Sequence, residues 1–94
     1  MSLSLKQIRY FIATAEAGQV SQAAINLSIS QSAITTAIRD LEETVGAALF
    51  ERTPHGMELT SAGRQFLSHA YDIQKKVEEA THLNLVTSNV SGVL

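Results

Sequence analysis

Apolar residues recur at helical spacing near the start of the chain. They step by three and four residues, as one buried face of a helix requires, and comprise Leu5, Ile8, Phe11, Ile12 and Ala15. This spacing predicts a helix over residues 5–17, and Gly18 stands where a C-terminal cap is expected.

Residues 20–39, VSQAAINLSISQSAITTAIR, have the pattern of two short amphipathic helices joined by a tight turn. The first helix is predicted over about residues 22–27. Ser21 is its expected N-cap, and Val20 and Ile25 have the spacing of a hydrophobic staple.

After a turn at residues 28–30, the second helix is predicted over residues 31–45, with Ser30 as its N-cap. Ile29 and Ile34 have the spacing of a second staple. The apolar stripe of this helix consists of Ile34, Ala37, Ile38, Leu41 and Val45. Its opposite face carries Ser32, Thr35, Thr36 and Arg39. Such a pair indicates a helix-turn-helix, whose second helix lies in the DNA major groove.

Two short strands are predicted after this unit, over residues 49–53 and 58–60. Residues 54–57 between them contain a proline and a glycine, which is a turn signal. The strands would form a small hairpin, or wing, with Phe50 and Leu59 facing the core.

A long last helix is predicted from Ser61 to about Val86, with Thr60 as its N-cap. Its apolar seam has heptad-like steps and comprises Phe66, Ala70, Ile73, Val77 and Ala80. Phe66 is expected on the domain's own core. The seam beyond Ala70 extends past what three short helices could cover, which favours dimerisation over intramolecular packing.

Composition permits one small domain, because the chain has 94 residues, of which 45% are hydrophobic. The formal net charge is −2, which is unlike a typical DNA-binding protein. No acidic residue lies between Glu16 and Asp40, however, so the proposed reading face is neutral to slightly basic. The absence of cysteine excludes disulfides and fits a cytoplasmic location. No apolar run is long enough to suggest a membrane span.

Catalytic chemistry finds little support in the sequence. His55, His69 and His82 are scattered without metal-ligand spacing, and no glycine-rich phosphate loop is present. Adjacent glutamates, at 42–43 and 78–79, would point in different directions on a helix. We therefore expect no enzyme activity, no cofactor and no metal site.

Candidate DNA-binding residues lie on the second and third helices and on the wing: Ser21, Gln22, Gln31, Ser32, Thr35, Thr36, Arg39, Arg52, Thr53 and His55. Gln31 has the chemistry for a bidentate contact with adenine, although a solvated glutamine is the ordinary alternative. Arg39 has two equal possibilities, a phosphate contact or an ion pair with a nearby glutamate. Arg52 is the stronger wing candidate, against a structural salt bridge, and His55 fits a solvated turn residue equally well.

Four segments in order, IRYFIATAEAG, SQAAINLSISQSAI, IRDLEETVGAALFERT and ELTSAG, closely resemble the N-terminal domain of LysR-type transcriptional regulators. The resemblance implies a winged helix-turn-helix, a linker helix that dimerises, and a C-terminal domain that senses a small-molecule effector. Two positions depart from the family pattern. Ser32 stands where proline is usual and Thr36 where arginine or lysine is usual, and the wing is less basic than in the family.

The expected architecture is mainly α. Residues 3–60 would form a winged helix-turn-helix (three helices and a β-hairpin wing, with the helix-turn-helix at about 20–39), and residues 61–88 the linker and dimerisation helix. Residues 89–94 would start a linker to an absent effector domain. The expected partners are double-stranded DNA and a second copy of the chain through Ala70, Ile73, Val77 and Ala80. A tetramer of the full-length protein is an open possibility, and no membrane partner is expected.

Two other functions remain open at this point. A winged helix that has lost DNA binding could use its long helix to recruit a protein partner, which the negative net charge favours. A stand-alone winged-helix regulator of another family would share the chemistry but not the linker helix.

Overall fold

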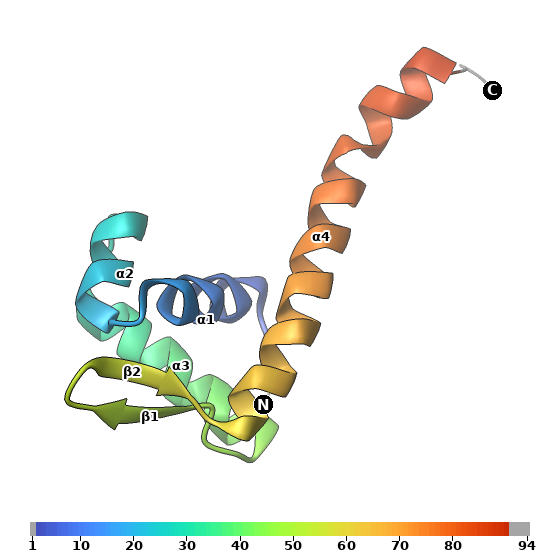
Figure 1. Ribbon diagram of the computed structural model, residues 1–94. Coiled ribbons are helices and arrows are strands. Elements are labelled where there is room, and N and C mark those ends of the chain that lie inside the picture. The colour runs from blue at the N-terminus through green and yellow to red at the C-terminus, as the bar shows by residue number, and fades with distance from the viewer. Residues whose placement is uncertain (1, 91–94) are drawn as a thin grey trace.

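A computed structural model describes residues 2–90 of the chain, with side chains for residues 2–82. Within that range three short helices and a hairpin form a head, and a long helix leaves the head and extends away from it (Figure 1). The elements are α1 (Leu5–Ala17), α2 (Val20–Leu27), α3 (Gln31–Val45), β1 (Phe50–Thr53), β2 (Gly56–Leu59) and α4 (Ser61–Val90). This is the predicted winged helix-turn-helix followed by a long helix.

Helix ends follow local chemistry. Ser4 caps α1 in a reciprocal capping box with Gln7. Gly18 ends α1 in the left-handed conformation, as predicted. Ser30 caps α3, because its hydroxyl accepts a hydrogen bond from the Ala33 amide at 3.1 Å. These caps fix where α1 stops and where α3 begins.

The predicted start of α2 was wrong. The Ala23 amide donates to the Gln19 carbonyl at 3.1 Å, so helical bonding begins earlier and Gln19 occupies the N-cap position. Ser21 therefore lies inside the helix. Ile25 is 70% exposed and cannot staple the helix end against Val20.

The core joins every element of the head. Phe11 is fully buried at its centre. Its ring lies 5.2 Å from that of Phe50 in β1 and 5.1 Å, edge to face, from that of Phe66 in α4. As predicted, Phe66 packs on the domain's own core, and so does Phe50.

Two residues expected in buried stripes lie at the surface instead. Leu5 is 59% exposed and Val45 is 39% exposed. Each lies in a terminal turn of its helix, where the helix extends past the elements that cover its middle. The remaining members of the α3 stripe are buried: Ile34, Ala37, Ile38 and Leu41.

The hairpin turn is tighter than the predicted segment 54–57. β1 and β2 pair antiparallel with Thr53 opposite Gly56 and Arg52 opposite Met57, so only Pro54 and His55 form the loop. Gly56 has a φ of 130°, and a Cβ there would collide with the carbonyl oxygen of Gly18. The Met57 amide donates to that same carbonyl at 2.8 Å. The wing is thus fixed to the end of α1.

α4 begins as predicted, because the Thr60 hydroxyl accepts from the Gly63 amide at 2.9 Å and caps the first turn. The helix continues to Val90, so the predicted end near Val86 and the linker start at residue 89 were wrong. No glycine or proline interrupts residues 64–90, which explains the longer helix. Residues 91–94 of the expected linker lie outside the described residues. Among the described residues, no helix combines the length and apolar character needed to cross a membrane.

Candidate nucleic-acid interface

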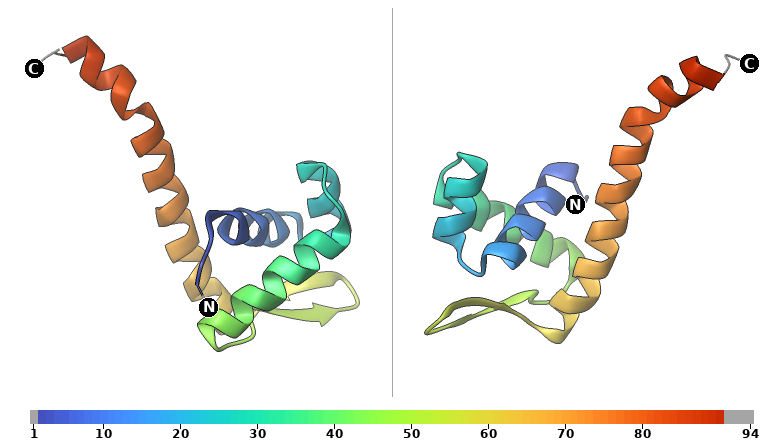
Figure 2. Two further views of the ribbon diagram at one scale, coloured as in Figure 1. Left: turned by 180° about the vertical axis from the view of Figure 1, so that it is seen from behind. Right: turned by 45° about the horizontal axis from the view of Figure 1, so that its top comes forward.

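The outward face of α3 is polar and exposed. Its residues are exposed while the opposite face is buried in the core, and they comprise Gln31, Ser32, Thr35, Thr36 and Arg39. Seen from behind (Figure 2, left), α3 lies toward the viewer, with α1 on one side and the hairpin on the other. The only acidic residues on the described exposed surface of α3 lie in its second half, at Asp40 and Glu43.

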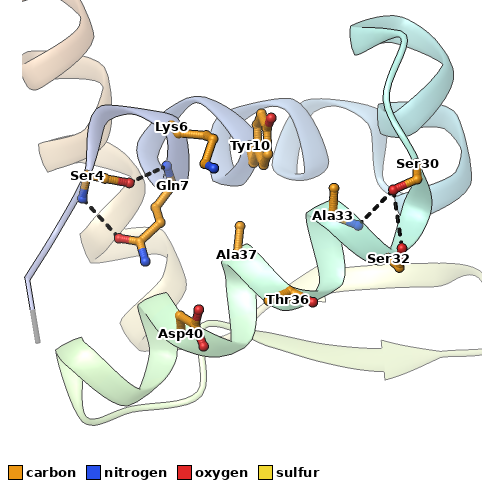
Figure 3. Close-up of a pocket in the computed structure, with 10 residues that line it drawn as sticks. All are labelled: Ser4, Lys6, Gln7, Tyr10, Ser30, Ser32, Ala33, Thr36, Ala37 and Asp40. Atoms are coloured by element: carbon orange, nitrogen blue, oxygen red, sulfur yellow. Dashed lines mark hydrogen bonds between the residues drawn. The ribbon is translucent and has the colours of Figure 1, made fainter.

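A groove lies on each flank of this face. The wing-side groove, of about 260 Å³, lies between α3 and the hairpin, and it brings together Thr35, Arg39 and Arg52. The α1-side groove, of about 620 Å³, lies between α3 and the first half of α1 (Figure 3). Ser32 and Thr36 line this second groove. The α3 face is therefore a ridge between two hollows.

Both arginines of the wing-side groove are available to an external anion. Within residues 2–82, neither Arg39 nor Arg52 forms an ion pair; the pair found there is Lys76–Glu79 on α4. Glu42, which could have neutralised Arg39, instead accepts hydrogen bonds from the Leu49 and Phe50 amides at 2.8 and 3.3 Å. This carboxylate holds the start of β1 against α3. No sequence signal indicates this role, because both partners are backbone amides, which no side-chain pattern marks.

The wing residues are placed differently from one another. Arg52 is exposed beside α3, and His55 is exposed at the tip of the turn. The Thr53 hydroxyl accepts from the His55 amide at 3.1 Å and donates to the Gly56 carbonyl at 3.3 Å. Thr53 thus shapes the turn, which leaves its hydroxyl little capacity for another partner.

Ser21 and Gln22 are exposed in the first turn of α2, the helix that precedes α3. The Gln22 side-chain amide donates to Asn26 at 2.9 Å along the same helix. Neither side chain lines the two grooves beside α3.

The predicted dimerisation seam divides at Ala70. Ala70 is fully buried in the head, so it offers no surface to a partner, and its assignment as a dimer contact was wrong. Ile73 is half-buried, whereas Val77 and Ala80 are exposed. The exposed Leu5 of α1 adds to this surface, because it lines a small apolar groove of about 130 Å³ with Ile73 and Val77. The helical spacing of Leu5 had predicted a position in the core.

No described residues bring three or more His, Asp or Glu side chains together in a way that could hold a metal ion.

Known proteins similar to this chain are regulators. Residues 5–64 match the family model described as bacterial regulatory helix-turn-helix protein, lysR family. The chain is 43% identical over 79 residues, 84% of its length, to the HTH-type transcriptional regulator TfdT of Cupriavidus pinatubonensis, covering 35% of that protein. It is 43% identical over 90 residues, 96% of its length, to the HTH-type transcriptional regulator ClcR of Pseudomonas putida, covering 29% of that protein. The chain thus spans about a third of the length of these curated relatives.

Among solved structures, the chain is similar to the CbnR_DBD-DNA complex, with a TM-score of 0.84 and 38% identity. The match covers 89% of this chain and 97% of the other. CbnR, described as a LysR family transcriptional regulator, matches with a TM-score of 0.84 and 39% identity over 87% of this chain and 28% of that one. These likenesses support the winged helix-turn-helix assignment.

Proposed function

Because this chain belongs to the LysR family of bacterial regulatory helix-turn-helix proteins, we propose that it binds double-stranded DNA sequence-specifically as part of a transcriptional regulator. α3 would enter the major groove, and the wing would contact flanking DNA. The protein would act in the cytoplasm, where bacterial DNA lies. We propose no catalytic role for this domain.

One observation supports this proposal most directly: the exposed ridge of α3 is free of acids in its first half and borders a groove that contains Arg39 and Arg52. Short side chains at Ser32, Thr35 and Thr36 allow the helix backbone to approach base edges closely, and a threonine methyl can contact a thymine methyl. The arginines of this groove would contact a phosphate backbone at its edge. Phosphate contacts supply affinity, and base contacts supply specificity.

The base-reading role falls on Gln31, Ser32, Thr35 and Thr36. Arg39 and Arg52 would contact phosphates, with Ser21 and Gln22 at the start of α2 as further backbone contacts. His55 at the tip of the wing is a weaker candidate. Thr53 acts in the proposal by shaping the wing, because its hydroxyl is engaged in the turn.

A second copy of the chain is the proposed partner of the α4 surface formed by Leu5, Ile73, Val77 and Ala80. Val77 and Ala80 line a shallow apolar groove of about 360 Å³ on α4 together with Ile73. Two heads joined through this surface would read two half-sites of a pseudo-palindrome. A small-molecule effector and a tetrameric assembly are proposals for a full-length protein only.

The salt dependence of binding to a random-sequence duplex, measured beside the mass of the chain in solution, tests this function. We expect weak binding whose logarithm falls steeply with the logarithm of salt concentration, because cations on the protein displace counterions from DNA. We also expect a particle of twice the chain mass. A folded dimer that does not bind any duplex at low salt would contradict DNA binding and favour a protein-interaction module.

A further inference from the structure

The α1-side groove is the larger of the two grooves beside α3, and no phosphate contact has been assigned to it so far. It lies between the first half of α1 and residues 32–40 of α3, and its volume is about 620 Å³. α3 contributes Ser32, Thr36 and Asp40 to its lining, and α1 contributes Lys6 and Tyr10. Ser32 and Thr36 also belong to the exposed ridge of α3, so the groove opens beside the face that would read bases.

A helix in the major groove has a DNA backbone on each side. The groove is about 12 Å wide and a helix with side chains is about 10–12 Å across, so the two phosphate backbones must lie against both flanks of the helix. In this chain α3 has one hollow toward the wing and one toward α1. The wing-side hollow contains Arg39 and Arg52. The phosphate backbone of the other DNA strand would therefore contact the α1 side of α3.

We propose that the α1–α3 groove holds the phosphate backbone of one DNA strand, with the Lys6 ammonium group as its contact. This inference rests on the proposed DNA-binding function. Lys6 is exposed, and its side chain extends from α1 toward α3 over the groove (Figure 3). It is the cation among the residues that line this groove. Gln7, beside it, is held in the capping box with Ser4 and is less free to move.

Asp40 determines how strong this contact is. It is the acidic residue lining the same groove, and Lys6 forms no ion pair with it within the described side chains. The Asp40 carboxylate would therefore repel a phosphate that Lys6 attracts. The groove has balanced formal charges of one cation and one anion, so removal of either should shift DNA affinity in opposite directions. Opposite shifts in DNA affinity would distinguish a phosphate-binding groove from a surface that does not contact DNA.

Four single variants of the whole chain test the proposal, with binding to random and operator duplexes measured across a range of salt concentrations. Lys6→Ala should make the negative slope of log K against log salt shallower by about 1 per subunit. The lost contact corresponds to a loss of affinity of roughly eightfold at 0.1 M salt. Lys6→Arg should retain the slope. Asp40→Asn should strengthen binding to both duplexes by a similar factor. Arg52→Ala is the positive control, with a comparable loss from the wing side.

Lys76→Ala is the matched negative control, because Lys76 pairs with Glu79 on α4 and does not line the groove. Circular dichroism and thermal unfolding confirm that each variant is folded. A folded Lys6→Ala variant with the wild-type slope would overturn the proposal while the DNA-binding function stands. A wild-type chain that binds no duplex would instead overturn the proposed function, and this inference with it.

Discussion

The head and the outer stretch of α4, residues 73–82, differ in how far they bury their apolar side chains. In the head, Phe11 contacts rings from β1 and α4, and a single core joins all the elements. Along the outer stretch, Val77 remains 38% exposed although it borders Leu5 of α1 in a small apolar groove. The head can fold on contacts made within one chain. The outer stretch carries a similar apolar spacing, but beyond Ile73, which packs against the core, its side chains would gain further burial only in the proposed dimer.

The largest effect should come from the centre of the head. Phe11→Ala removes a fully buried ring that two other aromatic rings contact. We expect a loss of about 3–5 kcal/mol in the free energy of unfolding, measured by urea denaturation. Ile25→Ala is the control, because Ile25 is 70% exposed, and a surface change of this kind is expected to cost about 0.5 kcal/mol or less. Equal effects of the two substitutions would mean that the head does not depend on this core.

A substitution in the outer stretch of α4 should affect self-association of the chain rather than folding of the head. Val77→Asp places a charge in the proposed dimer surface, so we expect self-association to weaken by at least about 2 kcal/mol, roughly 30-fold in Kd. Analytical ultracentrifugation measures this change. Lys75→Asp is the control, because residue 75 lies about 200° around the helix from Val77. A dimer that survives Val77→Asp unchanged would place the interface elsewhere.

Most of the head could be predicted from its sequence because its signals are local. Apolar residues at steps of three and four, Ser30 before α3 and Gly18 after α1 specify helices and their ends. The hairpin could be predicted from the turn residues between two short strand segments, but its register could not. The Gly56–Gly18 contact that tightens the turn joins residues far apart in sequence.

Errors arose where periodicity does not reveal what covers a face. Leu5 and Ala70 both fit apolar stripes, yet Leu5 is exposed and Ala70 is buried in the head. The difference depends on where α4 crosses α1, which no local pattern encodes. The α3 face could be predicted as polar, but the two grooves beside it, and the role of Glu42 in anchoring β1, required the three-dimensional arrangement.

The reading surface of the head offers the next test. Gln31→Ala removes a side chain at the start of the α3 ridge that can donate to and accept from adenine. We expect specific binding to weaken by about 1–3 kcal/mol, with relaxed base preference, while binding to random duplex changes little. Operator and random duplexes titrated at one salt concentration provide the measurement. Equal losses on both duplexes would assign Gln31 to the backbone instead.

The smallest effect should arise where the head and α4 meet. The Tyr71 hydroxyl on α4 donates to the Glu16 carboxylate of α1 at 2.7 Å. This hydrogen bond, followed by desolvation and by the charge of Glu16, raises the pKa of Tyr71 above the ordinary tyrosine value of 10.0. Because the folded state favours the protonated phenol, the contact contributes fully below about pH 10. Its contribution is lost as pH rises through the raised pKa.

Tyr71→Phe should therefore reduce stability slightly at pH 8 and make the free energy of unfolding less dependent on pH above 10, compared with the wild type. Urea denaturation at pH 8 and at pH 11 measures both effects. Tyr10→Phe is the matched control, since it removes the other tyrosine of the chain and leaves the Glu16 contact in place. If the two variants showed the same pH dependence, the Tyr71–Glu16 contact would not hold α4 against the head. The direction in which α4 leaves the head would then depend on its apolar packing alone, through Phe66, Ala70 and Ile73.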